Sequence, residues 1–230
     1  MSHPEFDRYA TEYKDLLREP IRDRFARDPR FFTERKWILI RDYLRTAGFD
    51  SASLSWLDVG CGEGDLMRMG AHHFARVAGC DVSPGMLQHA QGLDIRLQPS
   101  STQLPFGDQE FDFTTAVCVF HHVEPAQRLA LILEMRRILR PGGVICLIEH
   151  NQQNPVVRGM VKRIPVDANA VLLAQRECHD LFRRAKLRSL GTEFFLYLPE
   201  KLYRRVGFLE TFGKSVPLGG QFAAFGVRPA

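Results

Sequence analysis

The sequence predicts an α/β protein with a seven-stranded, mostly parallel sheet, helices on both faces, an antiparallel final strand and additional helices at the N-terminus. Three observations predict this fold. From Ser55 onwards, short apolar runs alternate with amphipathic stretches, as strands alternate with helices. One apolar run leads directly into a turn with three glycines and then into a helix. Between residues 5 and 48, apolar residues recur at the three-to-four spacing of helices.

Seven apolar runs are the expected strands, at residues 54–60, 76–82, 94–98, 111–120, 143–150, 190–198 and 221–227. The intervening helices are expected at residues 64–70, 84–91, 125–139 and 174–185. The third of these helices ends in Arg-Pro-Gly-Gly, which is a strong stop signal because proline cannot continue a helix. The last two runs are expected to close the sheet as an antiparallel pair.

The chain is expected to have two parts. Residues 1–50 form a helical appendage or lid, and residues 51–230 form one α/β domain. Two stretches, 151–175 and 199–219, interrupt the alternation of strands and helices. The first follows the end of a strand and is longer than a usual connection, so we expect both stretches on the substrate side of the domain.

Composition excludes several classes of protein. The 230 residues are 45% hydrophobic and 25% charged, which is typical of a globular protein. A net charge of +4 gives no support for a nucleic-acid partner. The apolar runs are too short to cross a membrane, and the N-terminus has no export signal, so we expect a cytoplasmic protein. Five widely spaced cysteines without a C-x-x-C pair fit neither a disulfide framework nor a zinc site, and no metal is expected.

The strongest functional signal is a glycine-rich turn followed by an acid. In Leu57–Asp65, Gly60, Gly62 and Gly64 follow a buried strand and precede a helix, so a ligand can approach the backbone and its free N–H groups. Asp81 ends the next strand, where a carboxylate can accept hydrogen bonds from both ribose hydroxyls. Together they predict an adenosine site. The third glycine comes one position too early for a dinucleotide fingerprint, which disfavours a nicotinamide oxidoreductase.

Four ordered blocks of sequence resemble the class I S-adenosylmethionine (SAM) dependent methyltransferases, close to the subgroup that includes UbiE. They are the D-V-G-C-G-E-G loop from Asp58, the S-P-G-M-L turn from Ser83, the L-P-F to H-H-V region, and L-R-P-G-G from Leu139. The resemblance runs from about residue 54 to 148 and loosens beyond. It implies a Rossmann-like fold for the α/β domain, with SAM as cofactor and S-adenosylhomocysteine as product.

The same resemblance implies where SAM binds. The glycine loop contacts the methionine part, Asp81 binds the ribose and Met86 packs on the adenine. Many members of the family carry an aspartate where this chain has Ser100, so we expect the backbone groups of Ser101 and Thr102 to contribute more to adenine recognition. The full set of expected cofactor residues is Asp58, Gly60, Cys61, Gly62, Asp81, Val82, Met86, Ser100, Ser101, Thr102 and Cys118.

Histidines are the expected catalytic residues, because an O–H or N–H acceptor benefits from a base whose pKa lies near neutrality. His150 follows one strand, and His121 and His122 follow its neighbour, so all three should meet at the ligand-binding edge of the sheet. We prefer His150. The double histidine is usual in the family whatever the acceptor, so one of the pair could serve only to hold the backbone.

The acceptor is expected to be a small molecule bearing a hydroxyl or amine. The segment after Glu149 resembles bacterial methyltransferases of glycan and natural-product pathways, and the local excess of basic residues would suit a phosphate-bearing or lipid-linked acceptor. Candidate substrate residues are Tyr9, Tyr13, Glu149, Asn151 and Arg158. Two alternatives stay open: a nucleic-acid methyltransferase, and a non-catalytic binding subunit. The N-terminal helices could equally cap the substrate site or join two subunits of a homodimer.

Overall fold

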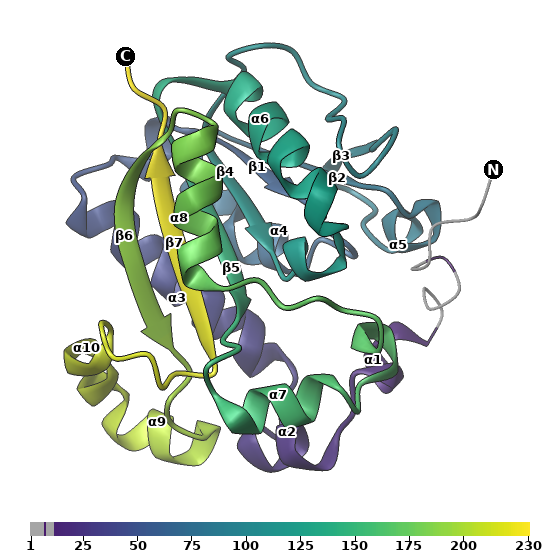
Figure 1. Cartoon of the computed structure of the whole chain (residues 1–230), viewed down its shortest axis with the longest axis vertical. Coiled ribbons are helices and arrows are strands. Elements are labelled where there is room, and N and C mark those ends of the chain that lie inside the picture. The colour runs from purple at the N-terminus through teal and green to yellow at the C-terminus, as the bar shows by residue number, and fades with distance from the viewer. Residues whose placement is uncertain (1–6, 8–11) are drawn as a thin grey trace.

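The computed structural model describes Asp7 and residues 12–230. Its strands are β1 (Ser55–Val59), β2 (Arg76–Asp81), β3 (Asp94–Leu97), β4 (Phe111–Val117), β5 (Leu139–His150), β6 (Arg188–Phe195) and β7 (Gln221–Val227). The helices around them are α1 (Tyr13–Leu16), α2 (Pro20–Phe25), α3 (Arg30–Thr46), α4 (Asp65–Gly70), α5 (Pro84–Gln88), α6 (Arg128–Ile138), α7 (Pro155–Val161), α8 (Gln175–Arg184), α9 (Glu200–Val206) and α10 (Glu210–Gly213) (Figure 1). Among these described residues, no helix is long and apolar enough to cross a membrane.

The seven strands form one sheet in the order β3-β2-β1-β4-β5-β7-β6. The pairs from β3 to β5 are parallel, and β7 lies between β5 and β6, antiparallel to both. The predicted fold class, including the antiparallel final strand, is therefore confirmed. Because β1, β4 and β5 are parallel neighbours, their carboxyl ends lie along one edge of the sheet, and ligand sites of open α/β sheets lie at that edge.

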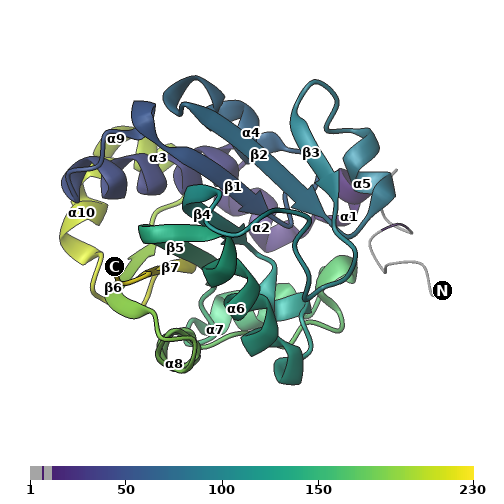
Figure 2. The ribbon, with the colours of Figure 1, turned by 90° about the horizontal axis from the view of Figure 1, so that it is seen from above.

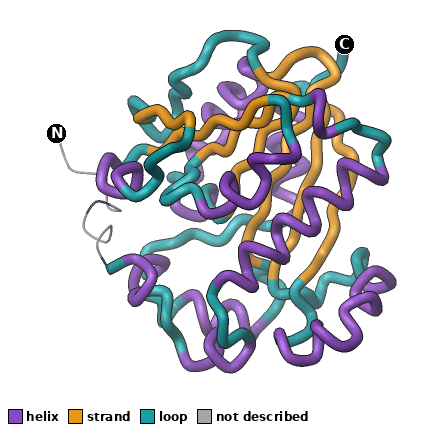
Figure 3. The backbone as a smooth tube through the Cα atoms, turned by 180° about the vertical axis from the view of Figure 1, so that it is seen from behind, coloured by secondary structure: helices purple, strands orange, loops and turns teal. Residues whose placement is uncertain are grey.

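Apolar side chains alternate across the sheet, and this alternation divides the core into two clusters. Leu57, Ile145 and Leu147 pack with residues of α6 and α8, whereas Trp56 and Cys146 pack with residues of α3. Figure 2 shows α3 and α4 on one side of the sheet and α6 and α8 on the other. From behind, helices again lie in front of the strands (Figure 3). A parallel sheet needs this cover on both faces, since its strands are apolar on both.

Several boundaries differ from the sequence-based expectation. β5 begins at Leu139, four residues before the expected start at residue 143. The Pro-Gly-Gly segment belongs to the strand, and the pairing with β4 is irregular there. β4 ends at Val117, because Cys118 has a φ of +58° and turns the chain out of the sheet. Helix α5 is shorter than expected and ends at Gln88.

The N-terminal helix α3 is packed against the sheet. Trp37, Ile40 and Leu44 of α3 are buried, and Tyr43 stacks on Phe225 of β7 with ring centroids 3.5 Å apart. The guanidinium of Arg35 on α3 forms a buried ion pair with Glu210 of α10. Helix α3 is therefore one of the layers that cover the sheet, and it joins the C-terminal helices to the core.

Replacing Arg35 by methionine should lower the free energy of unfolding by about 3–5 kcal/mol, because the buried Glu210 carboxylate would lose its counter-charge. Urea unfolding measures this change. The matched control is Arg41→Met, which breaks the exposed Arg41–Asp42 pair on the same helix and should cost less than about 1 kcal/mol. Equal costs for the two variants would show that the buried pair does not anchor α3.

Candidate functional site

The glycine turn after β1 has backbone angles that favour glycine. Gly60, Gly62 and Gly64 have φ values of +69°, +53° and +79°. At Gly60 the need is also steric, since a Cβ atom there would lie 2.4 Å from Cγ2 of Val119. The N–H groups of Gly60 and Cys61 both donate to the carbonyl of Cys80, at 2.7 and 3.0 Å. The turn is thus fixed against the end of β2 and leaves an open backbone surface.

Asp81 lies at the end of β2, beside this turn. Its carboxylate accepts the N–H of Gly62 at 2.9 Å and the N–H of Ser83 at 2.9 Å. Burial raises the pKa of Asp81, and these N–H groups partly oppose that rise. Each carboxylate oxygen accepts one of these N–H groups, and Asp81 also lines a cavity. A carboxylate held in this way is suited to accept hydrogen bonds from a pair of ribose hydroxyls.

A cavity of about 620 Å³ lies over the glycine turn, and we name it the donor cavity. It is lined by Lys36, Gly60, Gly62, Asp81, Val82, Met86, Gln98, Pro99, Ser100, Ser101, Val117, Cys118, Val119, His122, Val123 and Leu131. Eight of the expected cofactor residues are in this lining. Asp58, Cys61 and Thr102 are not, and Asp58 instead lies beneath the turn. Two glycines and a buried carboxylate thus line one cavity, which fits the methionine and ribose sites that the resemblance implies for SAM.

Asp58 is buried and belongs to a hydrogen-bond chain under the turn. The Thr115 hydroxyl donates to Asp58 Oδ1 at 2.6 Å, and Trp56 Nε1 donates to Thr115 Oγ1 at 2.8 Å. Burial raises the pKa of Asp58 to about 7, although the Thr115 hydrogen bond opposes the rise. The Asp58 side chain thus bonds to β4, directly before the glycine turn in the sequence.

A second cavity of about 380 Å³ adjoins the first, and we name it the acceptor cavity. Its lining is Ile21, Arg22, Phe25, Phe32, Lys36, Cys118, His121, His122, His150, Asn154, Val156, Val157, Met160, Asp167, Leu196, Tyr197, Pro199, Leu218, Gly220 and Gln221. Lys36, Cys118 and His122 line both cavities. The two spaces therefore meet at these three residues.

The polar end of the acceptor cavity is a cluster of three histidines and two carboxylates. His121 Nδ1 lies 2.5 Å from Glu149 Oε2, and His121 Nε2 lies 3.5 Å from Asp167 Oδ1. His122 Nε2 lies 3.3 Å from the same Asp167 oxygen. The ring centroids of His121 and His150 are 5.2 Å apart. The three predicted catalytic histidines are thus brought together on one cavity wall.

The two buried carboxylates favour positive charge in this cluster. Burial alone would lower the pKa of His121, but the charges and hydrogen bonds of Glu149 and Asp167 outweigh burial and raise it to about 10. Burial and the charge of His121 lower the pKa of His150 to about 4. Burial would raise the pKa of Asp167, but its bonds to His121 and His122 lower it below its usual value.

The candidate substrate residues are placed in different ways. Glu149 and Asn151 are buried and line neither cavity. Glu149 binds the loop that carries His121, and the Asn151 amide donates to the carbonyls of Pro217 and Gly219. Arg158 is exposed on α7 and also lines neither cavity. Tyr9 lies outside the described residues, and Tyr13 is described only by its backbone, at the start of α1.

Sequence reasoning gave no role to Lys36, Gln98 or Asp167. Lys36 lies on α3, and its ammonium is 3.6 Å from the Cys118 sulfur at the junction of the cavities. No local motif marks it, because α3 and the end of β4 are distant in the sequence. Asp167 lies in the turn Pro165–Asp167 of the long segment after β5. Only the unusual length of that segment pointed to it.

The raised pKa of Asp58 predicts a pH-dependent stability. A buried acid that binds its proton more tightly when folded stabilises the fold below its unfolded pKa, and this stabilisation is lost as the pH rises through about 7. Between pH 5 and 8 the loss amounts to about 3 kcal/mol of unfolding free energy. Asp58→Asn should remove this component, so urea unfolding of the variant should vary less with pH. A parallel pH dependence in both proteins would contradict the assignment.

Asp81→Asn should weaken binding of S-adenosylhomocysteine by about 10–100-fold, because hydrogen bonds to a charged acceptor contribute about 1.5–3 kcal/mol. Calorimetry measures this affinity. Asp94→Asn is the matched control, since Asp94 lies at the start of β3, pairs with Arg76 at 3.2 Å and lines neither cavity. If both variants bound the ligand as the wild type does, Asp81 would not be the ribose acid.

Comparison with known proteins identifies the family. A family described as "Methyltransferase domain" matches residues 57–147. An uncharacterized methyltransferase from Synechocystis is 34% identical over 43% of this chain and 48% of its own length. The ubiquinone/menaquinone biosynthesis C-methyltransferase UbiE from Syntrophotalea carbinolica is 31% identical over 70% of this chain and 66% of its own length. A "Probable tRNA methyltransferase 9B" from Bos taurus is 26% identical over 57% of this chain and 29% of its own length.

The match to the Synechocystis protein thus covers less than half of that protein's own length. Among solved structures, a SAM-dependent methyltransferase from Thermotoga maritima has a TM-score of 0.69 at 19% identity, over 97% of this chain and 98% of its own. That likeness shows the fold, and the family follows from the matched domain and the relatives. The chain is a member of the class I S-adenosylmethionine-dependent methyltransferase family.

Proposed function

We propose that this protein transfers the methyl group of SAM to a hydroxyl of a largely apolar small molecule. The observation that carries the proposal is the meeting of the donor and acceptor cavities at Lys36, Cys118 and His122. A methyl group passes directly from donor to acceptor, so the two ligands must lie in contact. Positioning them in one continuous space supplies much of the catalysis.

The lining of the acceptor cavity supports the acceptor's chemistry. Its walls are mainly apolar and come from α2, α3 and α7, with Phe25, Phe32 and Val157 among them. His121, His122, His150 and Asp167 form one polar cluster in this lining. An amphiphilic ligand with one hydroxyl at that cluster would fit both parts. A volume of about 380 Å³ suits a small molecule and excludes a folded macromolecule from the cavity.

The chain's own residues carry the other tasks. SAM supplies a methyl group on a positively charged sulfur. The turn at Gly60 and Gly62 and the carboxylate of Asp81 would hold the donor, and Lys36 lines the same cavity. In the transfer, the acceptor oxygen forms a bond to the methyl carbon and the electron pair of the broken C–S bond stays on sulfur. The hydroxyl proton leaves, and the sequence-based proposal that His150 accepts it is consistent with the place of its ring on the cavity wall.

The test is transfer of labelled methyl from SAM into fractionated extract of the source organism. We expect label in the organic-soluble small-molecule fraction, and at least about tenfold less with Asp81→Asn when SAM is kept below its Kd for the wild type. Label in RNA would overturn the acceptor class in favour of the nucleic-acid alternative. No label in any fraction, despite binding of S-adenosylhomocysteine, would favour a non-catalytic subunit.

A blocking variant tests the acceptor cavity directly. Val156 on α7 lines this cavity and is 55% exposed, so Val156→Trp should obstruct the cavity without disturbing the core. Methyl transfer should fall at least about tenfold through a higher KM for the acceptor, while affinity for S-adenosylhomocysteine stays unchanged. The control is Leu133→Trp, at an exposed position of α6 that lines neither cavity. Unchanged transfer in Val156→Trp would place the acceptor elsewhere.

A further inference from the structure

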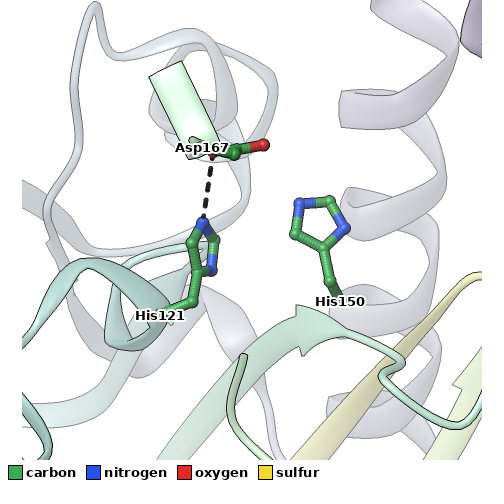
Figure 4. A group of neighbouring side chains, drawn as sticks. All are labelled: His121, His150 and Asp167. Atoms are coloured by element: carbon green, nitrogen blue, oxygen red, sulfur yellow. Dashed lines mark ion pairs between the residues drawn. The ribbon is translucent and has the colours of Figure 1, made fainter. Parts of the chain in front are cut away.

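Three side chains from three distant segments converge at the polar end of the acceptor cavity. His121 comes from the turn Phe120–His122 after β4, His150 from the end of β5, and Asp167 from the turn Pro165–Asp167. One ligand atom of each lies within 4.8 Å of the other two. Figure 4 shows the His150 ring beside that of His121, with the Asp167 carboxylate above His121 on the side of His150. Their spacing leaves a position that all three could contact.

We propose that His121, His150 and Asp167 bind one divalent transition-metal ion that faces the acceptor cavity. Two imidazole nitrogens and one carboxylate oxygen are ligands that suit Zn²⁺, Mn²⁺, Fe²⁺ or Co²⁺, whereas Mg²⁺ and Ca²⁺ prefer sites made of oxygen. Three protein ligands leave further coordination positions open, as in catalytic sites. Sequence analysis expected no metal because the cysteines have no metal-binding spacing; these three ligands come from distant segments and form no spacing motif.

The surroundings of His121 support this assignment. Glu149 is fully buried and occupies Nδ1 of His121, which leaves Nε2 directed towards Asp167. Histidine ligands of metals commonly donate their other ring N–H to a carboxylate, which fixes the orientation of the ring. Glu149 is itself fixed, because its other oxygen accepts the N–H groups of Val119 and Phe120 at 3.1 and 2.7 Å. The ring therefore has little freedom to turn away from the site.

Charge supports the same conclusion. Glu149 and Asp167 place two carboxylates in the buried cluster, with exposures of 0% and 6%. Both carboxylates contact His121, and a divalent ion between His121, His150 and Asp167 would add further positive charge beside them.

The metal site deepens the proposed function and gives the ion a use there. An ion at this place lies on the acceptor cavity wall, beside His122, which also lines the donor cavity. It would hold the acceptor oxygen and lower the pKa of its hydroxyl, whose proton would pass to solvent water. His150 would then be a ligand instead of the proton acceptor. Binding of the ion can be measured without any acceptor, so it is tested independently of methyl transfer.

The experiment is a titration of the full chain, prepared without a histidine tag and freed of metal by a chelator. Co²⁺ binding is followed by visible absorption and Zn²⁺ binding by calorimetry. We expect one ion per chain. His150→Asn and Asp167→Asn should each weaken binding at least about tenfold, and His89→Asn, which changes an exposed histidine outside the cluster, should not. Retained binding of S-adenosylhomocysteine shows that each variant is folded.

The outcomes separate the two proposals. No saturable binding of Co²⁺ or Zn²⁺ below about 1 mM would overturn the metal site and return His150 to the role of proton acceptor. Binding that is unaffected by Asp167→Asn would overturn it as well, because the ion would then lie elsewhere. Binding at the expected site without methyl transfer to any fraction would leave the metal site standing and overturn the proposed function instead.

Discussion

The buried carboxylate of Glu149 is the constraint on which both cavities depend. It lies at the penultimate position of β5, has no exposure to solvent, and accepts three hydrogen bonds from the loop that follows β4. Those bonds fix Val119, Phe120 and His121 relative to the sheet. A buried carboxylate is costly unless hydrogen bonds or opposite charges compensate it, so these three bonds hold the loop in place against β5.

Residues of the loop fixed by Glu149 line both cavities. Cys118 and His122 line the donor and the acceptor cavities, and Val119 closely approaches Gly60 of the glycine turn. The antiparallel strand β7 also contacts this loop. The amide of Gln221, which lines the acceptor cavity, donates to the Cys118 sulfur at 3.3 Å. The relative position of the two ligands thus depends on one loop between two buried strands. Glu149, a candidate substrate residue, is hydrogen-bonded to this loop and lines neither cavity.

The sequence predicted the fold and most of the donor cavity, because both depend on local patterns. Alternating apolar runs indicate strands whatever their partners, and Gly60, Gly62 and Asp81 are required by a turn of a few residues. The predictions failed where a distant contact decides the outcome. Nothing near Lys36 shows that α3 reaches the end of β4, and nothing near Asp167 shows that its turn returns to His121. The bulge in β5 is a similar case, because pairing with β4 overrides the proline and glycines that predicted a loop.

The donor and acceptor cavities differ in the same way, because the first depends mainly on local turns and the second on contacts between distant segments. The donor cavity is built largely from the segments that follow β1, β2, β3 and β4, with Lys36 of α3 and Leu131 of α6 added to its wall. The acceptor cavity takes its walls from α2, α3, α7 and the segment before β7, which are joined by contacts such as Arg35 with Glu210 and Arg163 with Glu19. Substitutions in these helices can reshape the apolar walls while Glu149 still holds the histidines in place. On the proposed function, acceptor specificity would depend on the helical segments around the sheet, and the chemistry of transfer on the residues at the strand ends.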